Sequence, residues 1–171
     1  MPVSCSIEKW PATCVLGLLI VAPPAGFAAQ PLSDLARLLL GTVSGKPSGM
    51  SGVTRLTARD AERQLSLACS ELARSAPIVL DNSTRLTGCA VRPGKVVEFQ
   101  LKVSGVDPRR DDTKKFMAFV RPILERGICR NPDVPLLGKL GVTLDYRYLV
   151  GQEPLVALHI FPDRCKEKAE T

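Results

Sequence analysis

The sequence predicts an exported α+β domain. Two β-hairpins form a four-stranded antiparallel sheet, two main helices pack on one face of it, and disulfides stabilise the fold. The chain alternates between stretches with helical periodicity and pairs of stretches with the two-residue periodicity of strands. A short turn sequence joins the members of each pair, which is typical of antiparallel hairpins. A short apolar segment near the start and four later cysteines indicate export and disulfide bonding.

Residues 1–28 have the pattern of a signal peptide. Lys9 supplies a positive charge, residues 14–22 (CVLGLLIVA) are apolar, and Gly26 and Ala28 are small residues placed for cleavage. The apolar run is shorter than the roughly 20 residues that span a hydrocarbon core. A lipoprotein signal would require a cysteine directly after the small residues at the end of this segment, but Ala28 and Ala29 are followed by Gln30. We therefore expect a cleaved signal peptide and a periplasmic protein without a stable membrane span, with an uncleaved anchor as the alternative.

Residues 29–52 are expected to contain a short helix and a linker. Residues 31–40 (PLSDLARLLL) favour a helix with Ser33 as its N-cap. The following Gly- and Ser-rich stretch, residues 41–52, is typical of a flexible linker. We place the start of a single folded domain at residue 53 and its end at residue 165, before a charged tail at 166–171. The early helix is interpreted as a loosely docked arm or as a partner-binding segment.

A second helix is predicted over residues 57–77. Thr57 is a plausible N-cap, and Pro77 ends the pattern. Apolar residues recur at spacings of three and four along it, so Cys69 is expected to face the core.

Residues 79–103 predict the first hairpin, which turns at Pro93-Gly94. In its first strand, one face carries Leu86, Gly88 and Ala90, and the other carries Thr87, Cys89 and Val91. The segment before it, Asp81-Asn82-Ser83-Thr84, has two interpretations. Its short polar side chains could satisfy backbone donors at the entrance to the hairpin, or they could form a recognition loop.

The second half of the chain repeats this order. A helix is expected from Asp111 and Asp112, its candidate caps, to Gly127, its expected C′ residue, with a kink at Pro122. Its predicted apolar face consists of Phe116, Phe119, Val120, Ile123 and Leu124. Residues 131–139 are expected to form a loop, and two strands follow around the turn Gly151-Gln152.

Sequence motifs for catalysis are missing. His159 is the only histidine, and its place in an apolar strand favours a structural or surface role. No nucleophile elbow, phosphate-binding loop or zinc-protease motif occurs. We expect no catalytic residue, no metal and no cofactor. A small enzyme using Asp81, Asp111 or His159 is the least favoured alternative.

The later cysteines are Cys69, Cys89, Cys129 and Cys165, and their wide spacing favours disulfides over zinc. Four cysteines allow three pairings. The segment from residue 127 to residue 165 resembles the closing segment of small periplasmic pilotins of type II secretion.

The matching positions are Cys129, Leu137 or Leu140, Gly141-Val142, Tyr146 or Tyr148, Gly151-Gln152 and Cys165. The resemblance implies a Cys129–Cys165 bridge, which leaves Cys69 to pair with Cys89. Pilotins are lipoproteins that carry a secretin to the outer membrane, and this chain lacks the lipid-accepting cysteine.

The net charge of +6 favours a protein partner with an acidic surface. The candidate partner surface consists of Arg109, Arg110, Lys114, Lys115 and Arg121. Nucleic acid is not expected, because no exposed aromatic residues that could stack bases are evident. The leading hypothesis is a non-catalytic binding or accessory protein, for example of an envelope secretion or assembly apparatus. The alternative is an inhibitor or immunity-type protein against a secreted hydrolase.

Overall fold

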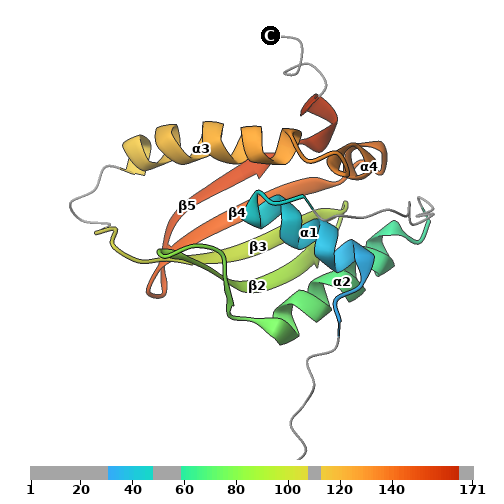
Figure 1. Cartoon of the computed structure of the whole chain (residues 1–171), viewed down its shortest axis with the longest axis horizontal. Coiled ribbons are helices and arrows are strands. Elements are labelled where there is room, and N and C mark those ends of the chain that lie inside the picture. The colour runs from blue at the N-terminus through green and yellow to red at the C-terminus, as the bar shows by residue number, and fades with distance from the viewer. Residues whose placement is uncertain (1–30, 48–58, 108–112, 166–171) are drawn as a thin grey trace, which may run out of the picture.

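A computed structural model describes residues 31–47, 59–107 and 113–165 (Figure 1). The predicted signal peptide, Thr57, residues 109–112 and the charged tail lie outside these ranges. The helices are α1 (Asp34–Ser44), α2 (Ala61–Ser75), α3 (Thr113–Cys129), α4 (Val134–Lys139) and the 3-10 helix η1 (Pro162–Cys165). The strands are β1 (Ile78–Val79), β2 (Thr84–Arg92), β3 (Val96–Val103), β4 (Thr143–Val150) and β5 (Glu153–Ile160).

The strands form one five-stranded sheet in the order β1-β2-β3-β4-β5. The two predicted hairpins are present as the antiparallel pairs β2–β3 and β4–β5. The prediction of a fully antiparallel four-stranded sheet is wrong, because β3 and β4 pair in parallel and β1 adds a fifth strand. The chain leaves β3, passes through α3 and re-enters the sheet beside β3 in the same direction. A helical crossover between neighbouring strands produces a parallel pair.

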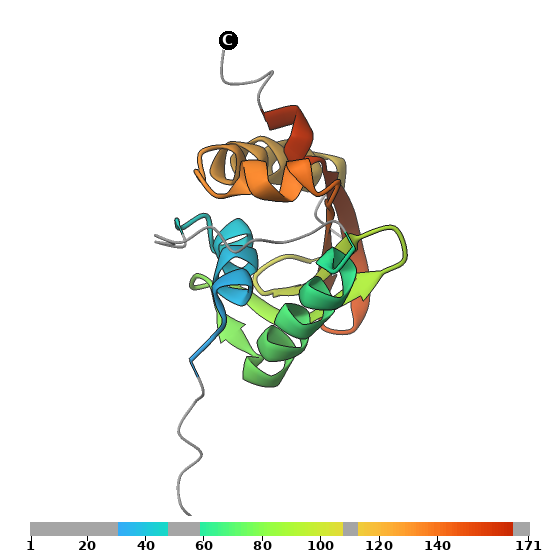
Figure 2. The same ribbon diagram turned by 90° about the vertical axis from the view of Figure 1, so that its right-hand side faces the viewer.

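The core lies between the sheet and the helices, which occupy one side of it (Figure 2). From the sheet, Phe99 and Tyr146 stack with ring centroids 5.2 Å apart. Both are fully buried, together with Leu38 of α1 and Leu72 of α2. The helices therefore cover one face, as the sequence predicts, and none of the described helices covers the other, which is called here the open face (Figure 2).

Helix α1 belongs to this core. Leu35, Leu38 and Leu39 are buried against the rest of the domain, so α1 is not a loosely docked arm. Ser33 is the N-cap, as predicted, and its side chain accepts a hydrogen bond from the Ala36 N–H. The helix runs past the predicted end to Ser44 and stops at Gly45, whose left-handed conformation suits a glycine.

Strand β2 contains a register shift between Leu86 and Gly88. The extra residue moves Cys89 to the helix side, where Leu86 also lies, since their partners Phe99 and Leu101 share one face of β3. The predicted division of this strand into two faces is therefore wrong after Thr87.

Two helix ends in the second half also differ from the prediction. Helix α3 continues past Gly127 to Cys129, so Gly127 is inside the helix and is not its C′ residue. The expected loop at residues 131–139 contains α4, with Pro135 in its first turn. Proline is compatible with that position, because the first helical N–H groups have no partner within the helix.

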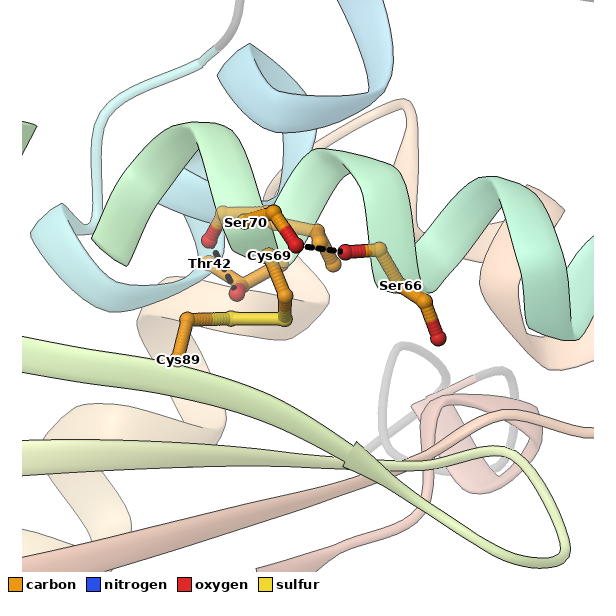
Figure 3. Close-up of a disulfide and its surroundings, with 6 residues drawn as sticks. Thr42, Ser66, Cys69, Ser70 and Cys89 are labelled. Atoms are coloured by element: carbon orange, nitrogen blue, oxygen red, sulfur yellow. Dashed lines mark hydrogen bonds between the residues drawn. A yellow bond between two sulfur atoms is a disulfide. The ribbon is translucent and has the colours of Figure 1, made fainter. Parts of the chain in front are cut away.

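Two disulfides hold the helices to the rest of the fold. Cys69 of α2 bonds Cys89 of β2 (Figure 3), and Cys129 at the end of α3 bonds Cys165 of η1. This is the pairing that the resemblance implied. Among the described residues, no helix is long and apolar enough to cross a membrane.

Candidate functional site

A groove opens between α3, the end of α1 and the sheet. It has a volume of about 460 Å³ and is called here the apolar groove. Its wall on α3 is formed by Phe116, Phe119, Val120, Ile123, Leu124 and Gly127. Phe119 is 70% exposed and Ile123 is 48% exposed. The predicted apolar face of α3 is therefore only partly covered by the protein itself.

The end of α1 forms a second wall, from Thr42 to Gly45. The Tyr146 hydroxyl donates a hydrogen bond to the Thr42 carbonyl at 3.2 Å, which fixes this end over the sheet. At Gly127, α3 approaches α1 closely, since an added Cβ there would lie 3.7 Å from the Gly45 Cα. This approach closes the base of the groove.

The turn between β1 and β2 forms the polar end of the groove, with Asp81, Ser83 and Thr84. Asp81 Oδ1 accepts hydrogen bonds from the Ser83 N–H at 2.7 Å, the Ser83 hydroxyl at 2.9 Å and the Thr84 N–H at 2.8 Å. Desolvation acts to raise the pKa of Asp81, but these hydrogen bonds outweigh it and lower that pKa. The carboxylate is therefore used by its own turn, as the structural interpretation predicts, although the turn also lines the groove.

Tyr148 lines the groove from the sheet. Its ring meets Phe116 edge to face, with centroids 5.5 Å apart. Burial, and then the negative charge of Asp81, raise the pKa of Tyr148 to about 12. The phenol is therefore protonated at neutral pH and offers a hydroxyl group rather than a base or nucleophile.

Only part of the predicted basic surface lies within the described residues. Arg109 and Arg110, and the cap candidates Asp111 and Asp112, lie outside the described residues. Lys115 is exposed and stands four residues before Phe119, beside the apolar groove. Arg121 instead lines a different depression, between α3 and the end of β5. Of the described residues, Lys115 and Arg121 therefore lie beside different depressions.

His159 lies on the open face of the sheet, in a charge cluster formed by Arg92, Glu98, Asp145, Arg147 and His159. Glu98 and Asp145 are only 2% and 3% exposed. Glu98 meets Arg92 and Arg147, each at 3.1 Å, and Asp145 meets Arg147 at 3.2 Å. His159 Nδ1 is 3.4 Å from Asp145 Oδ1. These contacts give His159 a place in an ion-pair network.

The apolar groove can bind apolar groups. Within residues 31–47, 59–107 and 113–165, no three His, Cys, Asp or Glu side chains are grouped to hold a metal. Asp81 and His159 lie on opposite sides of the sheet, so the structure does not bring these candidates together. The apolar walls and the exposed Phe119 are suited to a hydrophobic ligand surface.

Helical periodicity alone predicts the apolar face of α3, but it does not reveal whether that face is covered. For that reason, the groove could not be predicted from the sequence.

No protein-family model matches the chain, and no curated protein matches its sequence. A search of solved structures finds a candidate secreted protein from Pseudomonas aeruginosa, with a TM-score of 0.53 and 19% identity. The match covers 67% of this chain and 99% of that protein. A second match, the type II secretion system pilotin AspS from Vibrio cholerae, has a TM-score of 0.48 and 14% identity. It covers 63% of this chain and 94% of AspS, a protein of the class that the C-terminal segment resembles in sequence.

Proposed function

We propose that this protein is a non-catalytic accessory protein of the cell envelope that binds an apolar segment of a protein partner in the apolar groove. The observation that carries the proposal is the exposed apolar wall of α3. Phe119 and Ile123 face solvent beside a groove whose floor is already built from buried residues. Exposed apolar surface that lines a groove marks interaction sites in soluble proteins.

Export is supported by the two disulfides, which persist in oxidising compartments, and by the signal-peptide pattern. The fold shared with a candidate secreted protein agrees with it. A periplasmic location and a role in a secretion or assembly apparatus are part of the proposal.

Charge supplies the second element of partner recognition. Lys115, Phe119 and Arg126 lie in one row along α3, four and seven residues apart, and all three are exposed. An apolar partner segment flanked by acidic side chains would therefore match the groove and its rim. The Arg126 guanidinium bonds back to the Pro122 carbonyl at 3.1 Å, which holds it along this row.

A non-catalytic role is supported by the state of the titratable groups. The Asp81 carboxylate is occupied by three hydrogen bonds within its turn, and the raised pKa of Tyr148 keeps its phenol protonated. His159 contributes to the charge cluster on the other face of the sheet.

The proposal is tested by placing a photo-crosslinking amino acid at position 119, in full-length protein produced in its native envelope. Position 67 on α2 is the matched control, because Leu67 is also apolar and exposed, at 53%, but does not line the groove. We expect a discrete crosslinked partner from position 119 and none from position 67. Equal crosslinking at both positions, or none at either, contradicts the proposal.

Matched variants then measure affinity for the crosslinked partner. F119D should weaken binding at least tenfold, as for a buried aromatic anchor, whereas L67D should leave it unchanged. K114E/K115E should weaken binding at low salt with little change in melting temperature, since exposed charges contribute little to stability. If F119D folds normally and binds as well as wild type, the groove is not the site.

A further inference from the structure

Strand β5 is the last strand of the sheet on its side. It pairs with β4 from Glu153 to Ile160, and none of the other described strands pairs with its outer edge. Half of the backbone N–H and C=O groups of such a strand point away from the sheet. They form a row of donors and acceptors that only another extended chain can match fully.

The C-terminal end of β5 borders a groove. A depression of about 280 Å³, called here the edge groove, is lined by Arg121, Glu125 and Cys129 of α3 and by His159, Ile160 and Phe161 at the end of β5. Successive side chains of a strand point to opposite faces. A groove that touches both His159 and Ile160 therefore lies at the C-terminal end of the strand edge, beside α3. Figure 1 shows α3 running beside β5.

A second depression, of about 370 Å³, lies along the first half of β5. It is lined by Gln100 and Arg147 of the central strands and by Pro154, Val156 and Ala157 of β5. This depression reaches Gln100 of β3, so it lies over the open face of the sheet. A chain paired along β5 would place beside it only those side chains that point to that face. Backbone pairing combined with side-chain pockets is the way in which strand-adding domains recognise extended peptides.

The edge groove carries an excess of basic groups. Arg121 and Arg164 both line it, and the Arg164 guanidinium lies over the Phe161 ring, 4.7 Å from its centroid. Glu125 is the acidic residue of the lining and pairs with Arg121 at 3.7 Å. Within the part of the chain that the structure describes, Arg164 is held against an aromatic face rather than a carboxylate, so it is suited to an acidic ligand group.

The Cys129–Cys165 disulfide borders the same groove and joins α3 to η1. The end of the groove is therefore fixed covalently. A rigid slot between a strand and a helix lowers the ordering cost of binding an extended segment.

We propose that the outer edge of β5 binds an extended segment of a protein partner as a sixth strand, with an acidic side chain of that segment at Arg164. This site is separate from the apolar groove and does not depend on the function proposed for it. Its ligand class is an extended acidic peptide, because the edge supplies backbone hydrogen bonds and the groove supplies positive charge.

The test uses full-length protein and a capped eight-residue probe of alternating threonine and valine with one central glutamate. Amide hydrogen exchange of β5 is followed by NMR with and without the probe. β5 has a register shift opposite Tyr148 and Leu149, and Pro154 has no amide hydrogen, so the outward-pointing amides do not alternate strictly. We expect the β5 amides that do not pair with β4 to exchange rapidly in the free protein and to be protected at least tenfold by the probe. A probe methylated on alternate backbone nitrogens should lose this binding, and the F119D variant should retain it.

Charge variants test the acidic side chain. R164E should weaken binding of the glutamate probe about tenfold and should favour a lysine version of the probe. R85E, on an exposed residue near the other edge of the sheet, is the control and should change nothing.

Several outcomes overturn the proposal. They are the failure of the probe to protect β5, binding that survives backbone methylation, and protection in the free monomer of the β5 amides that do not pair with β4. Protection of β5 that appears only as protein concentration rises assigns the edge to a second copy of the chain and also overturns it.

Discussion

Tyr146 in the centre of the sheet donates a hydrogen bond to the carbonyl of Thr42, a residue 104 positions earlier in the chain. Both residues are buried, at 0% and 1% exposure. This bond ties α1 to β4, and through them the two halves of the molecule. Replacing Tyr146 by Phe keeps the ring and removes the bond, so unfolding should become easier by about 1 kcal/mol in urea denaturation.

The same residue predicts sensitivity to alkali. Burial raises the pKa of Tyr146, partly offset by the side chain of Thr42, and burial together with Asp81 raises that of Tyr148 to about 12. Above the ordinary tyrosine pKa of about 10, the unfolded chain releases these protons and the folded chain keeps them. Stability is therefore fully present below pH 10 and falls above it, by about 1.4 kcal/mol per pH unit for each tyrosine. Y146F should show about half of the wild-type slope in urea denaturation between pH 10 and pH 12.

At the polar end of the apolar groove, Asp81→Ala should cost about 0.5–2 kcal/mol, as for other side chains that cap backbone donors. Because the folded-state pKa of Asp81 is lowered, its contribution is present above the ordinary Asp pKa and is lost as pH falls through the folded value. In thermal denaturation between pH 2 and pH 7, the melting temperature of D81A should fall less steeply with decreasing pH than that of wild type. D81N, which keeps the acceptor oxygen, is the control and should restore most of the stability at neutral pH. If D81A melts like wild type but no longer binds the partner, the turn is a recognition site after all.

Two glycines of the second half predict opposite effects of the same change. At Gly138 in α4, an added Cβ would lie 2.9 Å from the Asp163 nitrogen and 3.0 Å from its Cα, so α4 and η1 would have to separate. G138A should therefore destabilise the protein by about 1–3 kcal/mol. At Gly127 in α3 the nearest atom lies at an ordinary 3.7 Å, so G127A should be neutral or stabilising by up to about 1 kcal/mol. Equal melting temperatures for the two variants would contradict this account.

Arg147 bridges the two buried carboxylates of the charge cluster, whereas Arg92 contacts Glu98 alone among them. Arg147→Met leaves Asp145 and Glu98 buried with fewer partners and should cost about 1–3 kcal/mol. Arg92→Met should lower the free energy of unfolding by a smaller amount. Chemical denaturation of both variants checks the order, and a larger loss for R92M would show that the cluster is held together from β2.

The local elements of this fold could be predicted from the sequence because their signals are local. The alternation in residues 97–103 and the Pro93-Gly94 turn define β3 and its hairpin, and Ser33 identifies the start of α1. The parallel pairing of β3 with β4 could not be predicted in this way. It depends on where α3 returns the chain, which is a property of the whole topology.

The candidate sites were less accessible to sequence reasoning for a related reason. Phe119 carries the same periodic signal as Phe116, yet only Phe116 packs against the sheet, at Tyr148. Whether an apolar residue is core or binding surface depends on what lies across from it. Arg121 likewise belongs to the edge of β5, a strand more than thirty residues later in the chain, which no local pattern connects to it.

The two disulfides each join cysteines that are neighbours in chain order, Cys69 with Cys89 and Cys129 with Cys165. A polypeptide that enters an oxidising compartment with its N-terminus first presents these thiols in the same sequence. The first bridge can close while the second half is still being delivered. Cys129 and Cys165 then have each other as partners, provided that the predicted signal peptide with Cys5 and Cys14 has been removed. The covalent pattern of this fold is therefore one that vectorial delivery produces directly, without a step that reshuffles wrongly paired cysteines.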